Sequence, residues 1–242
     1  MHFESGQNRF PVLYSYRRCP YAMRARLALY FSGIQVEQRE IVFWDKPDEM
    51  LAASAKGTIP VLLLPGGEVL DESWDIMCWA LKDKMGKSPL YPQDVQQQQL
   101  LMALIEENDT SFKANLDAYK YPEQFPEIPA EQARAQGELF LRTLEACLQN
   151  SRYLLGDSLT IADLAIFPFV RQFAHVDKAW FTQAAYPALQ AWLHRHLDSG
   201  YFKAVMKNRP VWRRGHQPLW LDEAELQTRD QFRQKAESDF PD

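Results

Sequence analysis

Apolar positions in the first 85 residues alternate between the period of a strand and the period of a helix. Residues 10–16 form an apolar run typical of a strand, and apolar side chains recur at helical spacing over residues 20–32. Gly33 follows that helix at the position where a left-handed C-cap is expected. The pattern therefore predicts a strand that turns directly into a helix.

The same alternation continues along the chain. We expect a second strand over 35–42, a short helix over 47–54, a hairpin made of 58–64 and 69–70, and a helix over 73–85. The order strand-helix-strand-helix-strand-strand-helix predicts a parallel β-α-β unit and an antiparallel hairpin in one sheet, with helices covering it.

From about residue 95 onward the pattern is helical only. Periodic apolar stretches predict four helices, over 95–118, 130–149, 161–174 and 187–198.

This change of period predicts two domains. We expect an α/β domain over 1–86, a proline-containing linker over 87–94 and an all-helical domain over 95–242. The last twenty residues are charged and lack a clear apolar face, so we expect them to be partly disordered.

Composition and charge exclude several classes of protein. Of the 242 residues 46% are apolar and 24% charged, and the net charge is −5 with no long basic tract, which excludes a nucleic-acid partner. No apolar run is long enough to cross a membrane, and the N-terminus lacks the pattern of a secretory signal. We therefore expect a cytoplasmic protein with neither a nucleic-acid nor a membrane partner.

The cysteines and histidines bear on metals and disulfides. Three scattered cysteines, Cys19, Cys78 and Cys147, are too few for a disulfide framework and indicate a reducing compartment. His194 and His196 are two residues apart, which places them on different faces of a helix, so no metal site is expected.

Cys19 stands at the predicted junction of the first strand and the first helix. Pro20 favours the first helical position, so the thiol faces the unpaired N–H groups and positive dipole end of that helix, which favour thiolate. Lowering the pKa by two units requires about 2.7 kcal/mol, and the dipole supplies about 0.3–1 kcal/mol, at most about 2. Direct N–H bonds, or the charge of Arg17 or Arg18, must supply the rest.

Ala22 occupies the position of the second cysteine in a C-x-x-C motif. No neighbouring thiol is therefore available to resolve a disulfide at Cys19, and its partner must come from another molecule.

Four short blocks then carry a family resemblance: Cys19-Pro20-Tyr21-Ala22 with Arg24 and Arg26-Leu27 behind them, Asp45-Lys46-Pro47, Ile59-Pro60-Val61-Leu62 and Asp71-Glu72-Ser73. In this order and spacing they resemble the thioredoxin-like domain of the cytosolic glutathione transferases, and most closely the omega class and its bacterial thiol-transferase relatives. The helical remainder is similar to the family's second domain. The resemblance implies the glutathione-transferase fold: a βαβαββα thioredoxin-like domain followed by an all-α domain.

The resemblance also implies a site for glutathione as co-substrate. Cys19 would be the catalytic residue, forming a mixed disulfide with glutathione. Lys46 would meet the glycyl carboxylate, and the backbone of Ile59 would pair with the cysteinyl residue. The implied glutathione contacts are Tyr21, Lys46, Ile59, Pro60, Glu72 and Ser73.

Physical reasoning supports several of these roles. A proline that opens a strand, as Pro60 does, suits a cis bond that presents the preceding backbone to a ligand. Ser73 is expected as the N-cap of the third helix, with N–H groups available for a carboxylate. Glu72 supplies an acceptor for an amine.

Other residues have simpler interpretations. We expect Cys78 and Cys147 in the core, and Thr160 and Asp163 as a capping box. Hydroxyls from Tyr14, Ser15, Tyr16 or Tyr21 would support only weak conjugation. Six aromatics of the helical domain are candidates for a second-substrate pocket, most of them simply core: Phe112, Tyr119, Phe169, Phe173, Trp212 and Trp220.

The resulting hypothesis is an omega-like glutathione transferase of the thiol-transferase or dehydroascorbate-reductase type, acting on mixed disulfides or similar oxidised substrates. The family also implies a homodimer. The alternative is a non-catalytic binding or regulatory protein that keeps the same fold.

Overall fold

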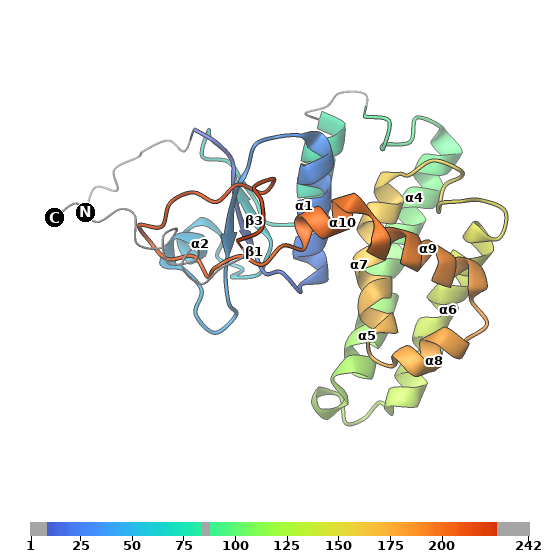
Figure 1. Cartoon of the computed structure of the whole chain (residues 1–242). Coiled ribbons are helices and arrows are strands. Elements are labelled where there is room, and N and C mark those ends of the chain that lie inside the picture. Colours follow the sequence, from blue (N-terminus) through green and yellow to red (C-terminus); the bar gives the residue numbers. More distant parts are fainter. Residues whose placement is uncertain (1–8, 84–87, 227–242) are drawn as a thin grey trace. The chain divides into compact units, whose positions relative to one another are not determined.

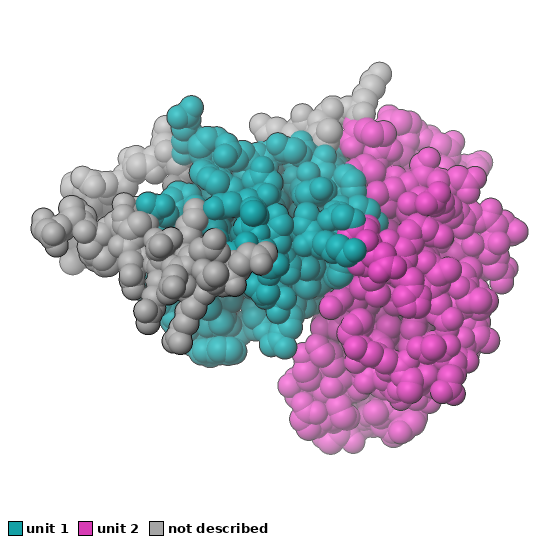
Figure 2. All heavy atoms as spheres, viewed as in Figure 1, with its two compact units in different colours: residues 1–86, 200–242 teal, residues 87–199 magenta. Residues whose placement is uncertain are grey.

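The computed structural model describes residues 9–83 and 88–226. The chain divides into two compact units (Figure 2), the first made of Met1–Gly86 with Gly200–Asp242 and the second of Lys87–Ser199.

The first unit is built on a four-stranded sheet of order β2-β1-β3-β4, where the strands are β1 (Val12–Ser15), β2 (Glu37–Glu40), β3 (Val61–Leu63) and β4 (Val69–Leu70). β1 runs parallel to β2, with Val12 opposite Glu37, and antiparallel to β3. β4 closes the hairpin with β3. The predicted parallel unit and hairpin are confirmed.

The helices of this unit are α1 (Pro20–Ser32), α2 (Asp48–Ala53), α3 (Ser73–Cys78) with a π turn over Trp79–Asp83, and α10 (Gly200–Val205). α1 and α2 lie on opposite faces of the sheet (Figure 1), and α1 packs against α3 and α10. The predicted order of strands and helices in this unit is therefore confirmed. Under α2, the sheet face carries a buried apolar cluster of Val12, Tyr14, Ile41, Met50, Ile59 and Val61.

Local signals in the sequence set both ends of α1. Pro20 is its first residue, where a missing N–H costs no hydrogen bond. Gly33 has a φ of 65° and donates its N–H to the Tyr30 carbonyl at 3.2 Å. A side chain with a Cβ is strained in this left-handed conformation, which is why glycine ends the helix.

Residues 206–226, the C-terminal strap, run back across the sheet of the first unit (Figure 1). The backbone N–H of Trp212 donates to the Glu40 carbonyl at 2.7 Å, and that of Gln38 donates to the Leu219 carbonyl at 2.7 Å. The strap therefore supplies hydrogen-bond partners to the outer edge of β2.

This arrangement corrects the expectation of an all-helical domain over 95–242, because the described residues from Gly200 onward group with the first unit. The strap has no helical periodicity, and its backbone groups find partners on β2 instead. Most of the segment expected to be disordered, residues 227–242, lies outside the described residues.

The strap also explains why a strand as polar as β2 is buried. Glu37, Gln38 and Glu40 are each less than a tenth exposed. Their polar atoms are satisfied locally: Arg39 Nε donates to Glu37 Oε1 at 2.6 Å, and Gln38 Nε2 donates to Glu40 Oε2 at 3.3 Å. Buried polar groups are tolerated when they are paired in this way.

The second unit is helical, as predicted. The first predicted helix runs on through a π turn to Lys120, and the short α8 was not predicted. The helical elements of the second unit are α4 (Val95–Glu107), the π turn Asn108–Phe112, α5 (Lys113–Lys120), a 3-10 turn over Pro122–Gln124, α6 (Ala130–Leu148), α7 (Ile161–Ala174), α8 (Lys178–Gln183) and α9 (Pro187–Asp198).

A buried carboxylate organises the start of α7. Asp163 accepts hydrogen bonds from the Thr160 N–H, the Thr160 hydroxyl, the Leu154 N–H and the Trp192 Nε1, all at 2.9 Å. Burial raises the pKa of Asp163, and these four donors oppose the rise. The expected structural role of Thr160 and Asp163 at this helix start is confirmed.

Two smaller expectations need correction. Cys78 and Cys147 are half-buried, not core residues. Trp212 and Trp220 belong to the strap of the first unit and not to the helical unit, whereas Phe112, Phe169 and Phe173 are buried in the core of the helical unit.

We predict that Gly137→Ala destabilises the helical unit. A Cβ at Gly137 would lie 2.6 Å from Cε2 of the buried Phe173. Such overpacking costs about 1–3 kcal/mol, more than the roughly 1 kcal/mol by which alanine favours a helix. Urea unfolding measures the loss.

Gly200→Ala is the matched control, because nothing lies within 4 Å of a Cβ built there. Adding Phe173→Leu to Gly137→Ala should recover part of the lost stability. Equal stability of Gly137→Ala and wild type would contradict the close approach of α6 and α7.

We predict a stability loss in acid that depends on His196. The imidazole is buried, with the Phe167 ring stacked at 4.8 Å, and burial together with nearby Arg195 lowers the pKa of His196 to about 3. An unfolded histidine titrates near 6.5. Below that pH the unfolded chain therefore binds a proton that the folded chain excludes, and the stability present above pH 6.5 is lost toward pH 3.

This single group should contribute up to about 1.4 kcal/mol of lost stability per pH unit within that window. The free energy of unfolding, measured in urea from pH 7 to pH 4.5, should fall less steeply for His196→Gln than for wild type. Parallel pH profiles for the two proteins would show that His196 does not carry this effect.

Candidate active site

Cys19 occupies the N-cap position of α1, at the end of a tight turn that follows β1. Its N–H donates to the Tyr16 carbonyl at 3.1 Å, and its carbonyl accepts from the Met23 N–H at 2.9 Å. The half-buried side chain packs against the apolar cluster of the sheet, which includes Ile59. The backbone thus holds the thiol at the start of a buried helix.

A fully buried guanidinium supports the turn that carries Cys19. Arg26 donates from Nη1 to the Ser15 hydroxyl at 2.5 Å and from Nη2 to the Arg17 carbonyl at 2.7 Å. Its Nε donates to the Val205 carbonyl at 2.9 Å, at the end of α10. Arg26 therefore ties the end of β1 to α1 and α10.

The electrostatics around Arg26 link it to Cys19. Burial lowers the pKa of Arg26, while the charges of Glu40 and Cys19 oppose that change. Glu40 also accepts the Arg17 N–H at 2.5 Å, and burial raises its pKa against the attraction of Arg26. A buried positive charge thus lies near the thiol, with Glu40 as its partner.

The sequence pointed to Arg17 or Arg18 for this charge, and it indicated Arg26 only as part of the family resemblance. The exposed Arg18 guanidinium instead bonds the Tyr16 hydroxyl at 2.7 and 3.1 Å. One signal pointed to Arg26: it stands between Ala25 and Leu27 on a helix that is buried on most sides. A charge in that setting must have internal partners.

The peptide bond between Ile59 and Pro60 is cis, as the sequence predicted for the start of β3. Ile59 is 7% exposed and packs in the same cluster as Cys19.

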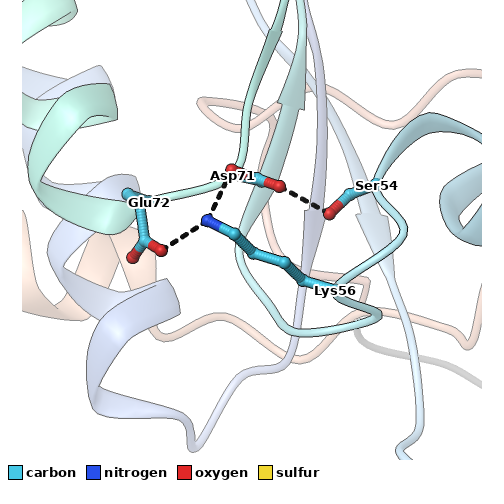
Figure 3. Close-up of polar contacts among 4 residues, drawn as sticks. All are labelled: Ser54, Lys56, Asp71 and Glu72. Carbon is cyan, nitrogen blue, oxygen red and sulfur yellow. Dashed lines mark hydrogen bonds and ion pairs between the residues drawn. The ribbon is translucent and has the colours of Figure 1, made fainter.

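Figure 3 shows a polar group at the start of α3. Lys56 Nζ donates to Glu72 Oε1 at 2.6 Å and to Asp71 Oδ1 at 3.1 Å, and the Ser54 hydroxyl donates to Asp71 Oδ2 at 2.7 Å. The Ser54 and Lys56 hydrogen bonds lower the pKa of Asp71. Lys56 was not identified from the sequence, because its partners lie 15 and 16 residues away in the chain.

Ser73 differs from its expected place by one position. Glu72 is the N-cap of α3 and Ser73 is its first residue. The buried Ser73 hydroxyl accepts from Arg24 Nη1 at 3.4 Å, and the Arg24 guanidinium lies 5.6 Å from the ring centre of half-buried Tyr21. Arg24 therefore connects the start of α3 with the first turn of α1.

Lys46 lies in the loop before α2. Its Nζ is 4.0 Å from the place where a Cβ on Gly57 would stand, so the loop before cis-Pro60 approaches it closely. A φ of +60° at Gly57 favours glycine at this point. Lys46 also lines a cavity of about 200 Å³.

Three of the four candidate hydroxyls are engaged in structural contacts. The Tyr14 hydroxyl accepts from Arg39 at 2.8 Å, and burial raises its pKa. Ser15 and Tyr16 accept from Arg26 and Arg18. These contacts leave Tyr14, Ser15 and Tyr16 poorly suited to activating a ligand thiol.

All seven predicted site residues lie in the first unit. Cys19 packs against the cluster that contains Ile59, and Arg24 links Ser73 with Tyr21. Lys46 and Glu72 instead lie against Gly57 and Lys56, which the sequence did not single out. Among the described residues, no three His, Cys, Asp or Glu side chains are grouped to hold a metal. No described helix has the length and apolar character needed to cross a bilayer.

Comparison with known proteins agrees with the fold of the two units. Residues 13–88 match the family model for the glutathione S-transferase N-terminal domain, and residues 126–195 match the model for its C-terminal domain. Pyrimidodiazepine synthase of Drosophila melanogaster is 28% identical over 191 residues, which are 76% of this chain and 75% of that protein.

Two further proteins are similar. Elongation factor 1-gamma 2 of Oryza sativa is 26% identical over 209 residues, and the match covers 78% of this chain but only 50% of the factor. A glutathione transferase family member from Pseudomonas fluorescens, solved with two glutathione bound, has a TM-score of 0.66 at 21% identity and covers 80% of this chain and 91% of its own.

The two family models match in order along the chain, and they fall on the thioredoxin-like sheet and on the helical unit described above. The chain therefore belongs to the glutathione S-transferase superfamily.

Proposed function

We propose that this protein is a glutathione-dependent thiol transferase of the omega-like kind, with Cys19 as its nucleophile. The observation that carries the proposal is the thiol at the N-cap of α1, at the end of a turn that buried Arg26 holds, with Ala22 where a resolving cysteine would stand. A cationic setting favours the thiolate, and the absence of a second thiol in the motif assigns the resolving step to glutathione.

The reaction has two exchanges. The Cys19 thiolate attacks the glutathione sulfur of a mixed disulfide, so that a Cys19–glutathione disulfide forms and the substrate leaves as a thiolate that takes up a proton. The thiolate of a second glutathione then attacks the glutathione sulfur of that disulfide. Cys19 returns as thiolate and oxidised glutathione leaves, so the net reaction converts one mixed disulfide and one free glutathione into the substrate thiol and one oxidised glutathione, and the proton gained by the substrate is the one lost by that glutathione.

The surrounding residues suit the ends of a glutathione molecule. The backbone of Ile59, ahead of cis-Pro60, would pair with the cysteinyl residue. Glu72 would accept the γ-glutamyl ammonium, with Ser73 and Tyr21 beside it. Lys46 would meet the glycyl carboxylate. We further propose a cytoplasmic homodimer, and oxidised substrates that include mixed disulfides or dehydroascorbate.

A non-catalytic binding protein is the second candidate, and the similarity to elongation factor 1-gamma favours it. The two functions differ in turnover. Both permit retention on immobilised glutathione, but only the transferase combines a Cys19 adduct with catalytic reduction of a mixed disulfide.

We predict that Cys19→Ser lowers mixed-disulfide reduction by at least about 100-fold, because removing a nucleophile costs orders of magnitude. Mass spectrometry of the wild type, treated with oxidised glutathione, should find one glutathione on Cys19 and none in the variant. Cys147→Ser is the matched control, since burial raises the pKa of Cys147. Full activity of Cys19→Ser would overturn the mechanism.

We predict that Glu72→Gln weakens glutathione binding about tenfold, because a hydrogen bond to a charged group contributes about 1.5–3 kcal/mol. Calorimetry with glutathione and with its N-acetyl derivative measures the effect. The derivative lacks the ammonium, so it should bind wild type and variant alike. Glu68→Gln, a change at an exposed position on the hairpin, is the control. An equal loss for both ligands would contradict the assigned role.

A further inference from the structure

The C-terminal strap meets the loop that contains Lys46. Arg213 Nη2 bonds Asp45 Oδ2 at 2.7 Å, and Arg214 Nε bonds Glu49 Oε1 at 2.5 Å. Two consecutive strap residues therefore bind carboxylates on either side of Lys46 in the sequence.

The preceding strap residue is firmly anchored. The Trp212 ring packs against the apolar cluster under α2 and meets the Tyr14 ring edge-to-face at 6.0 Å. The Arg39 guanidinium lies 4.3 Å from the Trp212 ring centre, and the Trp212 N–H bonds the Glu40 carbonyl at 2.7 Å. Arg213 and Arg214 thus extend from a fixed point on the sheet.

A buried arginine connects the two ends of the strap through hydrogen bonds. Arg209, 8% exposed, donates to the carbonyls of Trp220 at 3.1 Å, Glu223 at 2.8 Å and Ala224 at 3.1 Å. Leu221 is buried and donates its N–H to the Val36 carbonyl at 2.9 Å, just before β2. The strap is therefore a folded part of the first unit.

The charges around Lys46 balance only because of the strap. The cavity there is lined by three carboxylates and three cations: Asp45, Asp48, Glu49, Lys46, Arg213 and Arg214. Without the two arginines, an anionic ligand would face three negative charges and one positive charge. Within the described part of the chain Lys46 forms no ion pair, while Asp45 and Glu49 are held by the strap.

We propose that the strap is a charge-compensating element of the ligand site: Arg213 and Arg214 neutralise Asp45 and Glu49, which leaves the Lys46 ammonium available to a ligand carboxylate. The inference rests on the proposed function, in which that carboxylate is the glycyl end of glutathione. Without the arginines, the neighbouring carboxylates would repel the ligand and compete for Lys46. Arg213 and Arg214 are positioning residues, since they act through the acidic loop.

The test compares two ligands that differ only in the charge of this end, glutathione and its glycyl ethyl ester. For Arg213→Ala/Arg214→Ala we expect binding of glutathione to weaken about 3- to 10-fold, the effect of two exposed ion pairs. Binding of the ester should change by less than about twofold. In turnover, KM for glutathione should rise while kcat stays near the wild-type value.

Three further variants sharpen the result. Arg213→Lys/Arg214→Lys should retain binding, and Arg142→Ala, which removes an exposed arginine of the helical unit paired with Glu138 at 3.9 Å, should have no effect. Adding Asp45→Asn and Glu49→Gln to the double alanine variant should restore glutathione binding, because the uncompensated charges are then gone.

The outcomes separate clearly. Unchanged glutathione binding in the double alanine variant, or equal losses for glutathione and ester, overturns the inference while the proposed function stands. A loss that persists after the acidic residues are neutralised also overturns it, since the arginines would then contact the ligand directly. A wild-type protein that binds neither ligand overturns the proposed function and this inference together.

Discussion

The buried Arg26 guanidinium is the constraint on which the first unit depends. A charge with no access to water must be surrounded by acceptors, and breaking such a set costs several kcal/mol. Arg26 meets this requirement with Ser15 and the Arg17 carbonyl on one side and the Val205 carbonyl on the other, with Glu40 as countercharge. The same contacts fix the turn before Cys19 and the point from which the strap departs. The geometry of the thiol and the path of the C-terminal segment are therefore two consequences of one buried charge.

The strap also supplies hydrogen-bond partners to the outer edge of β2. An edge strand exposes backbone groups that need partners, and a strand as polar as β2 cannot gain much from apolar burial. The backbone groups of β2 pair with Trp212 and Leu219 of the strap. Its polar side chains form internal pairs, such as that of Arg39 with Glu37. The strap crosses this edge to reach the loop around Lys46. The segment that covers the sheet is therefore the same one that we propose sets the charge of the ligand site.

Much of the site was predictable because its signals are local. Short-range preferences predict the local conformation at three places: Pro20 after Cys19, Ile59-Pro60 before an apolar run, and Glu72-Ser73 at the start of a helix. Arg26, Lys56 and the strap arginines were not predictable in this way. Arg26 bonds the Val205 carbonyl 179 residues away, the partners of Lys56 lie 15 and 16 residues away, and those of the strap arginines lie 165 and 168 residues away. No spacing in one sequence identifies such a pair.

By itself the sequence determined the periodicity of the elements, the order of strands and helices, the ends of α1, and the position of one thiol without a resolving neighbour. These properties follow from steric and hydrogen-bonding preferences that act over a few residues. Only the tertiary structure decided which buried charge supports the turn before Cys19, which cation meets Glu72, and that the chain beyond Gly200 returns to the first unit. Those outcomes depend on hydrogen-bond and charge partners for buried charged groups and for an open strand edge. The residues that provide them are distant in the sequence and come together only in the folded chain.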